Sequence, residues 1–248
     1  MIRLEKIIVT YRTDAGIHEA LAGVDLAIER GTSCVIIGPT GCGKTSLLYL
    51  LAGLLEPASG QVILDGRPLS GVRRQTSLIL QQHGLFPWKN ALANASLGLG
   101  IRGAAREKVM GTTRTLMEKM GIWDVRRSYP AQLSGGQRQR VAIARSLATD
   151  PDLLLMDEPF SALDAMTRES LQELFLGLWK ERSFTSVLVT HSIEEAAFLG
   201  NRIVVLSPRP GRVLGILENP EMGDPRYRLS ESFHLMCSGI RRLMEGSR

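Results

Sequence analysis

Residues 38–45 carry the most specific chemical pattern in this chain. They read Gly-Pro-Thr-Gly-Cys-Gly-Lys-Thr and match the phosphate-binding pattern G-x-x-x-x-G-K-[ST]. Glycines let the backbone turn several N–H groups toward one anion. Lys44 can reach the β and γ phosphates of a nucleotide, and the Thr45 hydroxyl can bind Mg²⁺. The predicted nucleotide contacts are Gly38, Pro39, Thr40, Gly41, Cys42, Gly43, Lys44, Thr45 and Ser46.

Two adjacent acids follow a second apolar run. Residues 153–156 read Leu-Leu-Leu-Met, and Asp157 and Glu158 come directly after them. A carboxylate at a strand end can hold Mg²⁺, which assigns that role to Asp157. General-base catalysis needs a carboxylate near the attacking water, which assigns that role to Glu158. The alternative is that Asp157 and Glu158 form an ordinary turn at a strand end without a catalytic role, but the phosphate-binding pattern upstream disfavours it.

A second anion-binding element lies at Leu133-Ser134-Gly135-Gly136-Gln137. Ser134 is a good N-cap for the helix predicted from Arg138 to about Leu147. The glycines leave N–H groups exposed at the helix start, where an anion is favoured. Either the chain binds two anions separately, or this element serves the nucleotide of a partner chain arranged head to tail.

The elements that position these residues alternate between strands and helices. A short apolar strand, residues 34–37, precedes the glycine-rich loop, and a helix, residues 46–52, follows it. The other predicted strands are 2–11, 19–28, 61–66 (running into a tight turn), 76–80, 153–156, 186–189 and 202–206, the last followed by a turn at 207–212. Helical patterns dominate from about residue 91 to 149. This alternation predicts an α/β core with a mainly parallel sheet, interrupted by a helical insert.

Apolar stripes at helical spacing predict which faces are buried. The stripes are Val109, Thr113, Leu116, Met117 and Met120; then Leu171, Leu174, Phe175 and Leu178; and, in the tail, Phe233, Met236, Cys237, Ile240 and Met244. We expect the tail helix to pack on the chain's own core rather than to serve a partner.

Composition narrows the class of protein. The chain has 30 basic and 25 acidic residues in 248, without a dense basic run, so nucleic acid is not an expected partner. Its three cysteines form no pairing framework, which favours a reducing compartment. Because Cys42 lies at a helix start, its thiol pKa is expected to be lowered. No apolar run approaches the roughly eighteen residues that a membrane span needs, so any work at a membrane is expected to be peripheral.

The phosphate-binding loop, Leu-Ser-Gly-Gly-Gln and Asp-Glu-Pro occur in the order seen in the ATP-binding cassette of ABC transporters, and residues 2–215 resemble that family. The resemblance implies a P-loop NTPase (RecA-like) core with an antiparallel β subdomain and an inserted helical subdomain. It also implies two copies, or one copy and a homologous ATPase, that sandwich two ATP molecules, with Ser134, Gly135, Gly136 and Gln137 facing the nucleotide of the other subunit.

Four further site residues come only from this resemblance. Gln81 matches the glutamine that reaches Mg²⁺ and the attacking water, with Gln82 as its alternative. Asp164 matches the loop that crosses the dimer seam. His191 matches the switch histidine that contacts the γ phosphate, and Tyr11 matches the aromatic that stacks on adenine.

Residues 82–88 and 205–212 resemble the nitrate, sulfonate and taurine importer ATPases. The implied assembly is an ATP- and Mg²⁺-dependent ATPase at the cytoplasmic face of the inner membrane, with a separate permease and, indirectly, a solute-binding protein. The expected domains are 1–218, with the insert at about 89–149, and a helical tail at 219–248. Phe86-Pro87-Trp88 either docks the permease or anchors the insert. A soluble ABC ATPase acting on ribosomes or DNA, and a small-molecule kinase, are the alternatives.

Overall fold

The computed structural model describes residues 2–14, 16–224 and 226–246. Contacts within the chain divide it into two compact units. The first unit consists of Met1–Arg73 and Ser183–Arg248, and the second consists of Arg74–Arg182. The predicted insert, residues 89–149, lies inside the second unit. The chain therefore leaves the first unit once and returns to it once.

The N-terminal part of the first unit is an antiparallel sheet with strand order β2-β1-β4-β5. Its strands are β1 (Ile2–Thr13), β2 (Gly16–Ile28), β4 (Ser59–Leu64) and β5 (Arg67–Pro68). Alternate side chains of β1 are buried, including Ile2 and Leu4, as expected for a sheet with one covered face. Asp65 and Gly66 both have positive φ, 52° and 76°, in the tight turn between β4 and β5. The antiparallel β subdomain and this turn are therefore confirmed.

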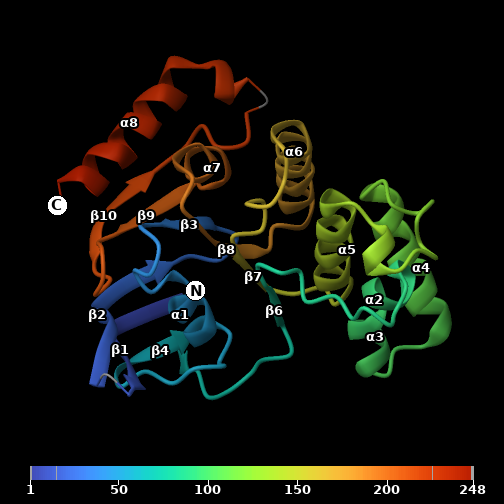
Figure 1. Ribbon diagram of the computed structural model, residues 1–248, viewed down its shortest axis with the longest axis horizontal. Helices are drawn as coiled ribbons and strands as arrows, with labels where there is room; N and C mark the ends of the chain where they lie inside the picture. The colour runs from blue at the N-terminus through green and yellow to red at the C-terminus, as the bar shows by residue number, and fades with distance from the viewer. Residues whose placement is uncertain (1, 15, 225, 247–248) are drawn as a thin grey trace. The chain divides into compact units, whose positions relative to one another are not determined.

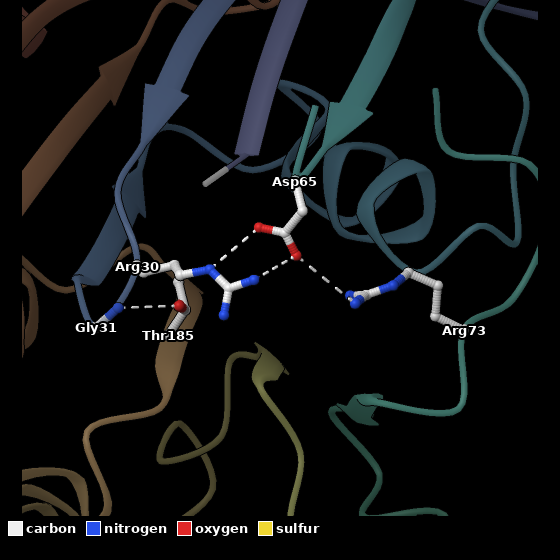
Figure 2. A network of polar contacts seen from close by, with 5 residues as sticks. All are labelled: Arg30, Gly31, Asp65, Arg73 and Thr185. Carbon is white, nitrogen blue, oxygen red and sulfur yellow. Dashed lines mark hydrogen bonds and ion pairs between the residues drawn. The ribbon is translucent and has the colours of Figure 1, made fainter. Parts of the chain in front are cut away.

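Polar contacts hold the β4–β5 turn in place within the first unit (Figure 2). The Asp65 carboxylate accepts from Arg30 Nε at 3.2 Å and pairs with Arg30 Nη2 at 2.8 Å. Arg73 Nη2 lies 3.9 Å from the same carboxylate. Nearby, the Gly31 N–H donates to the Thr185 hydroxyl at 3.1 Å. The network joins the segment after β2 to the β4–β5 turn and to the start of β8.

The other sheet strands of the first unit are mostly parallel. β3 (Ser33–Ile37) pairs in parallel with β8 (Thr185–Thr190) and with β9 (Arg202–Leu206), and β10 (Val213–Glu218) is antiparallel to β9. Every residue of β3 and β8 is buried, which is typical of a sheet covered on both faces. Helix α1 (Lys44–Leu51) contacts β8, and α7 (Ile193–Leu199) contacts β3.

The predicted tail helix is α8 (Glu231–Glu245), which lies along the end of the first unit (Figure 1). It contacts α7, β9 and β10. Phe233 and Ile240 are the buried residues of its apolar stripe. The expectation that this helix packs on the chain's own core is confirmed.

The second unit combines two parallel strands with a cluster of helices. β6 (Thr76–Ile79) pairs in parallel with β7 (Leu153–Asp157). The helices are α2 (Ala91–Ala95), α3 (Leu97–Ile101), α4 (Arg106–Lys119), α5 (Gly135–Ala148) and α6 (Ala165–Arg182). Helix α5 contacts each of the other four and β6, so it is the centre of this unit. The predicted α4 stripe is buried at Thr113, Leu116 and Met117, and the α6 stripe at Leu171, Phe175 and Leu178.

These elements confirm an α/β P-loop core with an antiparallel β subdomain and a helical insert. None of the helices in the described ranges combines the length and apolarity needed to cross a bilayer.

One buried amide organises the start of the insert. Asn94 is fully buried, and its side chain accepts from Phe86 N at 2.8 Å and donates to the carbonyls of Phe86, Lys89 and Asn90. We expect Asn94→Ala to lower the free energy of unfolding by about 2–3 kcal/mol, because buried backbone groups lose their partners. Urea denaturation measures this loss. The comparison variant is Asn90→Ala, which removes the N-cap of α2 and is expected to lower the free energy of unfolding by about 1 kcal/mol. Equal costs for the two variants would contradict the role given to Asn94.

Candidate active site

The glycine-rich loop lies between β3 and α1, as predicted, and it encloses the lysine. Gly43 is the N-cap of α1. Lys44 is buried, with only 6% of its surface exposed. Its Nζ donates to the carbonyls of Gly38 at 2.8 Å and Pro39 at 3.0 Å. A phosphate oxygen placed in the loop would take over these contacts with a charged acceptor, which strengthens them.

Close packing explains Gly43 of the loop and Gly211, which faces the loop. Gly43 has φ 99°, and a Cβ there would lie 2.6 Å from Leu21 Cδ2 and 2.8 Å from the Ala20 carbonyl oxygen. A Cβ at Gly211, in the turn after β9, would lie 2.1 Å from the Cys42 carbonyl oxygen. Gly211 also exchanges backbone hydrogen bonds with Ala20 and Ala22 of β2. The loop is therefore fixed between β2 and the turn at Gly211, which leaves no room for side chains there.

The first unit also places Tyr11 and His191 relative to the loop. Ile37 and Thr190 are paired across β3 and β8, so Gly38 and His191 follow neighbouring strand ends. His191 is exposed. The Tyr11 hydroxyl lies 2.9 Å from Ser46 Oγ of α1, and the Tyr11 side chain is 39% exposed. Tyr11 therefore lies beside the phosphate loop with its ring accessible.

The structure contradicts the expectation for Cys42. Burial is the main influence and raises the pKa of the Cys42 thiol, although the Lys44 charge and hydrogen bonds from backbone N–H groups lower it. A Cβ at Gly38 would lie 2.8 Å from Cys42 Sγ, so the thiol points into the packed loop rather than toward solvent. Desolvation of a thiolate outweighs the helix start and the nearby lysine.

We therefore expect iodoacetamide to alkylate Cys42 at pH 8 at least about tenfold more slowly than it alkylates glutathione, because the thiolate is the reactive form. Raising the pH toward 9 should speed the reaction, since a raised pKa leaves the thiolate scarce below it. Mass spectrometry of the Cys42 peptide follows the rate, with glutathione as the unburied reference. Modification of Cys42 at neutral pH as fast as that of glutathione would contradict this assignment.

The second unit brings Gln81 beside the acidic pair. Ile79 and Met156 are paired across β6 and β7, so Gln81 and Asp157 lie at neighbouring strand ends. Asp157 is 7% exposed, whereas Gln81 is exposed. Glu158 has φ 44°, an uncommon conformation for a residue with a side chain. The Ser161 hydroxyl donates to the Glu158 carbonyl at 3.0 Å, which holds this turn. A strained backbone of this kind is characteristic of functional positions.

The serine-glycine element begins α5 with a complete capping box. Ser134 Oγ accepts from the Gln137 N–H at 3.2 Å, and Gln137 Oε1 accepts from the Ser134 N–H at 2.9 Å. The predicted N-cap is confirmed, although the helix starts at Gly135 rather than at Arg138. A Cβ at Gly136 would lie 2.6 Å from Thr167 Cγ2, so this helix start packs closely against the start of α6. The Gly135 and Gly136 N–H groups remain available at the first turn.

Asp164 caps the start of α6, the helix that packs against the start of α5. Its Oδ1 accepts from the Thr167 N–H at 3.0 Å, and this hydrogen bond lowers the pKa of the Asp164 carboxyl. The segment before α6 lies beside the start of α5, because a Cβ at Gly135 would lie 3.6 Å from Leu163 Cδ2 and 3.9 Å from the Ala162 carbonyl oxygen.

Phe86 and Trp88 differ in their surroundings. Phe86 is half-buried and its backbone is bound by Asn94, whereas Trp88 is 70% exposed. Their ring centroids are 5.2 Å apart. Phe86 thus anchors the insert, and Trp88 presents an aromatic surface to solvent.

Sequence reasoning missed Arg145. Its Nη1 donates to the Gly84 carbonyl at 2.7 Å and its Nη2 donates to the His83 carbonyl at 2.8 Å. Arg145 thereby links the loop that follows Gln81 to α5, the helix capped by Ser134. An arginine on a helix carries no local signal of such a distant backbone contact.

The predicted site residues thus form two sets, one in each unit. Tyr11, the phosphate loop and His191 belong to the first unit, whereas Gln81, Ser134–Gln137, Asp157, Glu158 and Asp164 belong to the second. The donors proposed for Mg²⁺, namely Thr45, Gln81 and Asp157, are oxygen donors of the kind that ion prefers. Among the described residues there is no group of three or more His, Cys, Asp or Glu that could hold a metal.

Comparison with known proteins decides which kind of P-loop protein this is. The family model described as "ABC transporter" matches residues 21–161. The chain belongs to the ABC transporter family. As a member it is an ATP-binding subunit that hydrolyses ATP to ADP and phosphate in coupling with transport.

Relatives within the ABC transporter family cover most of the chain. The taurine import ATP-binding protein TauB of Yersinia pestis is 45% identical over 195 residues, which are 79% of this chain and 76% of that protein. The ABC transporter ATP-binding protein MJ0412 of Methanocaldococcus jannaschii is 39% identical over 232 residues, which are 94% of this chain and 86% of that protein.

Solved ABC cassettes share the fold. The dimeric post-hydrolysis structure of the cassette MJ0796 with ADP and Pi has a TM-score of 0.79 at 33% identity, and the match covers 88% of this chain and 98% of that one. The CbiO1 subunit of Clostridium perfringens, part of the CbiONQ transporter complex, has a TM-score of 0.78 at 25% identity, covering 97% and 94% of the two chains.

Proposed function

We propose that this ABC subunit powers the import of taurine or a related small sulfonate through a separate membrane permease. The observation that carries the proposal is the 45% identity to a taurine import ATP-binding protein over 79% of the chain. A TauB protein of Escherichia coli is also 44% identical over 201 residues. The resemblance of residues 82–88 and 205–212 to nitrate, sulfonate and taurine importers supports the same class of solute.

Two copies of the chain sandwich two ATP molecules in this proposal. The phosphate loop of one copy and the Ser134–Gly136 helix start of the other hold each nucleotide. Three features support the arrangement. The two anion-binding elements belong to different units, the α5 start keeps free N–H donors, and the MJ0796 cassette, at 33% identity, forms dimers. Asp164 then lies at the seam between the copies, and Tyr11 stacks on adenine.

Each side chain has a definite chemical task. Lys44 binds the β and γ phosphates, and His191 contacts the γ phosphate. Glu158 accepts a proton from the water that attacks the γ phosphate, while Gln81 orients that water. Thr45, Gln81 and Asp157 would hold Mg²⁺, which would neutralise charge on the nucleotide phosphates.

The permease supplies the membrane spans, and a solute-binding protein delivers the solute to it. The ATPase works at the cytoplasmic face of the inner membrane. Exposed Trp88 and the half-buried Phe86 beside it are the proposed docking surface for the permease, because aromatic residues are enriched at protein interfaces.

Uptake of radiolabelled taurine by cells that lack the gene tests the solute. The wild-type gene should restore ATP-dependent uptake, and Glu158→Gln should not. Retained uptake in the deletion strain would contradict the assignment. Affinity purification from native membranes tests the partner: a multispanning permease is expected, whereas ribosomes or DNA would favour the soluble alternative.

A further inference from the structure

The turn between β9 and β10, residues 207–212, is closed by its own hydrogen bonds. The Ser207 N–H donates to the Arg212 carbonyl at 2.9 Å, and Ser207 Oγ accepts from the Arg212 N–H at 2.9 Å. The same hydroxyl lies within donating distance of the carbonyls of Pro208, at 2.8 Å, and Pro210, at 3.0 Å. One serine therefore fixes the shape of the whole turn.

This turn is attached to the backbone of β2 at three points. The Gly211 N–H donates to the Ala20 carbonyl at 2.9 Å, and the Ala22 N–H donates to the Gly211 carbonyl at 3.0 Å. The Arg209 side chain is exposed, and its Nε donates to the Glu19 carbonyl at 3.1 Å. A hydrogen bond from a charged guanidinium is stronger than one between neutral groups. Arg209 and Gly211 together therefore hold residues 19–22.

The held part of β2 is paired with the part of β1 that carries Tyr11. Glu19 is paired with Thr10, and the next pair along the hairpin is His18 with Tyr11. Cross-strand partners move together because the ladder hydrogen bonds join their backbones. The Arg209 contact therefore bears on the position of the Tyr11 ring.

The same turn closes on the phosphate loop. A Cβ at Gly211 would lie 2.1 Å from the Cys42 carbonyl oxygen and 3.1 Å from Leu21 Cδ2. A Cβ at Gly38 would lie 3.1 Å from Leu206 Cβ, just before the turn. The backbone of the phosphate loop thus rests directly on the end of β9 and on the turn. One six-residue segment contacts both the phosphate loop and the strand paired with Tyr11.

We propose that the 207–212 turn is a brace that sets the spacing between Tyr11 and the phosphate loop, with Arg209 and Gly211 as positioning residues for the nucleotide. Arg209 acts through Glu19 on Tyr11, and Gly211 acts through Cys42 on the phosphate loop. A nucleotide must reach both places at once, so a site held at the right spacing binds it more tightly. The Arg209 part rests on the proposed stacking of Tyr11 on adenine.

Isothermal titration calorimetry of the full-length protein with MgADP and with magnesium pyrophosphate tests the brace. Pyrophosphate occupies the phosphate loop but has no base. Arg209→Ala should weaken ADP binding at least about fivefold and leave pyrophosphate binding within about twofold, because only the Tyr11 side loses a hydrogen bond. Arg209→Lys keeps a charged donor for the Glu19 carbonyl and should restore ADP binding to within about twofold of wild type. Equal weakening of both ligands in Arg209→Ala would contradict an action through Tyr11.

The matched control for Arg209 is Arg67→Ala. Arg67 is an exposed arginine of β5, at the opposite edge of the antiparallel sheet from β2. Its loss should change the affinity for either ligand less than about twofold, because solvent and salt screen a distant exposed charge. Weakening by Arg67→Ala as large as that by Arg209→Ala would reduce the Arg209 effect to net charge and refute the brace.

Gly211→Ala should weaken both ligands at least about fivefold, because the added Cβ displaces the Cys42 carbonyl and disturbs the pre-formed phosphate loop. Gly239→Ala on α8 is its control, since a Cβ there would meet only Leu217 Cδ1, at 3.8 Å. Thermal unfolding without nucleotide checks the fold of every variant. Arg209→Ala alters an exposed side chain, so it carries the test even if Gly211→Ala does not fold.

Tyr11→Ala separates this inference from the proposed function. It should weaken ADP binding at least about fivefold, because stacking of the base on an aromatic ring is lost. Normal ADP binding in Tyr11→Ala would refute the stacking role and, with it, the Arg209 part of the brace. Weakened ADP binding in Tyr11→Ala, with normal binding in Arg209→Ala and Gly211→Ala, would leave the stacking role intact and overturn the brace.

Discussion

Replacing Glu158 with Gln is expected to lower the rate of ATP hydrolysis at least about 100-fold, in the range that loss of a general base costs. ATP binding should stay within about twofold of wild type, because the amide is nearly isosteric and Lys44 still holds the phosphates. Since hydrolysis normally ends the closed state, the variant should accumulate as a nucleotide-bound dimer. Phosphate release measures the rate, and size-exclusion chromatography with ATP measures the dimer.

The position of Glu158 explains the size of this effect. It follows Asp157 at the end of β7, with φ 44° and with its carbonyl held by Ser161. Because the turn is fixed by the backbone, the side-chain change is expected to leave its geometry intact. Glu173→Gln, an exposed change on α6, is the matched control and should hydrolyse ATP at the wild-type rate. Wild-type turnover in Glu158→Gln would remove Glu158 from this role.

Lys44→Ala is expected to weaken ATP binding at least about tenfold, since it removes a charge-assisted donor to the phosphates. The loop itself should persist. The Cys42 N–H donates to the Pro39 carbonyl at 3.3 Å, and Gly43 is packed against Leu21. Titration with a fluorescent ATP analogue measures the affinity, and thermal unfolding without nucleotide checks the fold.

Lys108→Ala, which changes an exposed lysine of α4, removes the same charge at a distance and should bind ATP normally. If Lys44→Ala retained wild-type affinity, the assignment of residues 38–45 as the phosphate site would fail.

The sequence indicated where the candidate site residues lie in the fold, because each set follows a strand end. Gly38 and His191 follow β3 and β8, and Gln81 and Asp157 follow β6 and β7, so parallel pairing brings each set together. The Ser134 cap was equally predictable, because capping depends on residues three positions apart.

Long-range packing escaped prediction. The pKa direction of Cys42 was wrong because desolvation depends on how Gly38 and Gly211 close on the loop. The buried amide of Asn94 and the contacts of Arg145 with residues 83 and 84 are missing from local patterns for the same reason. Their partners are set by the packing of the insert, and neither residue type signals burial.

The central claim is that each ATP is shared between two copies of the chain. A structure of Glu158→Gln with ATP and Mg²⁺, determined by electron cryo-microscopy or crystallography, tests it most directly. The account predicts two nucleotides per dimer, each contacting Lys44 of one copy and Ser134 of the other. Nucleotides enclosed by a single copy, with Ser134 of the second copy remote from the γ phosphate, would contradict it.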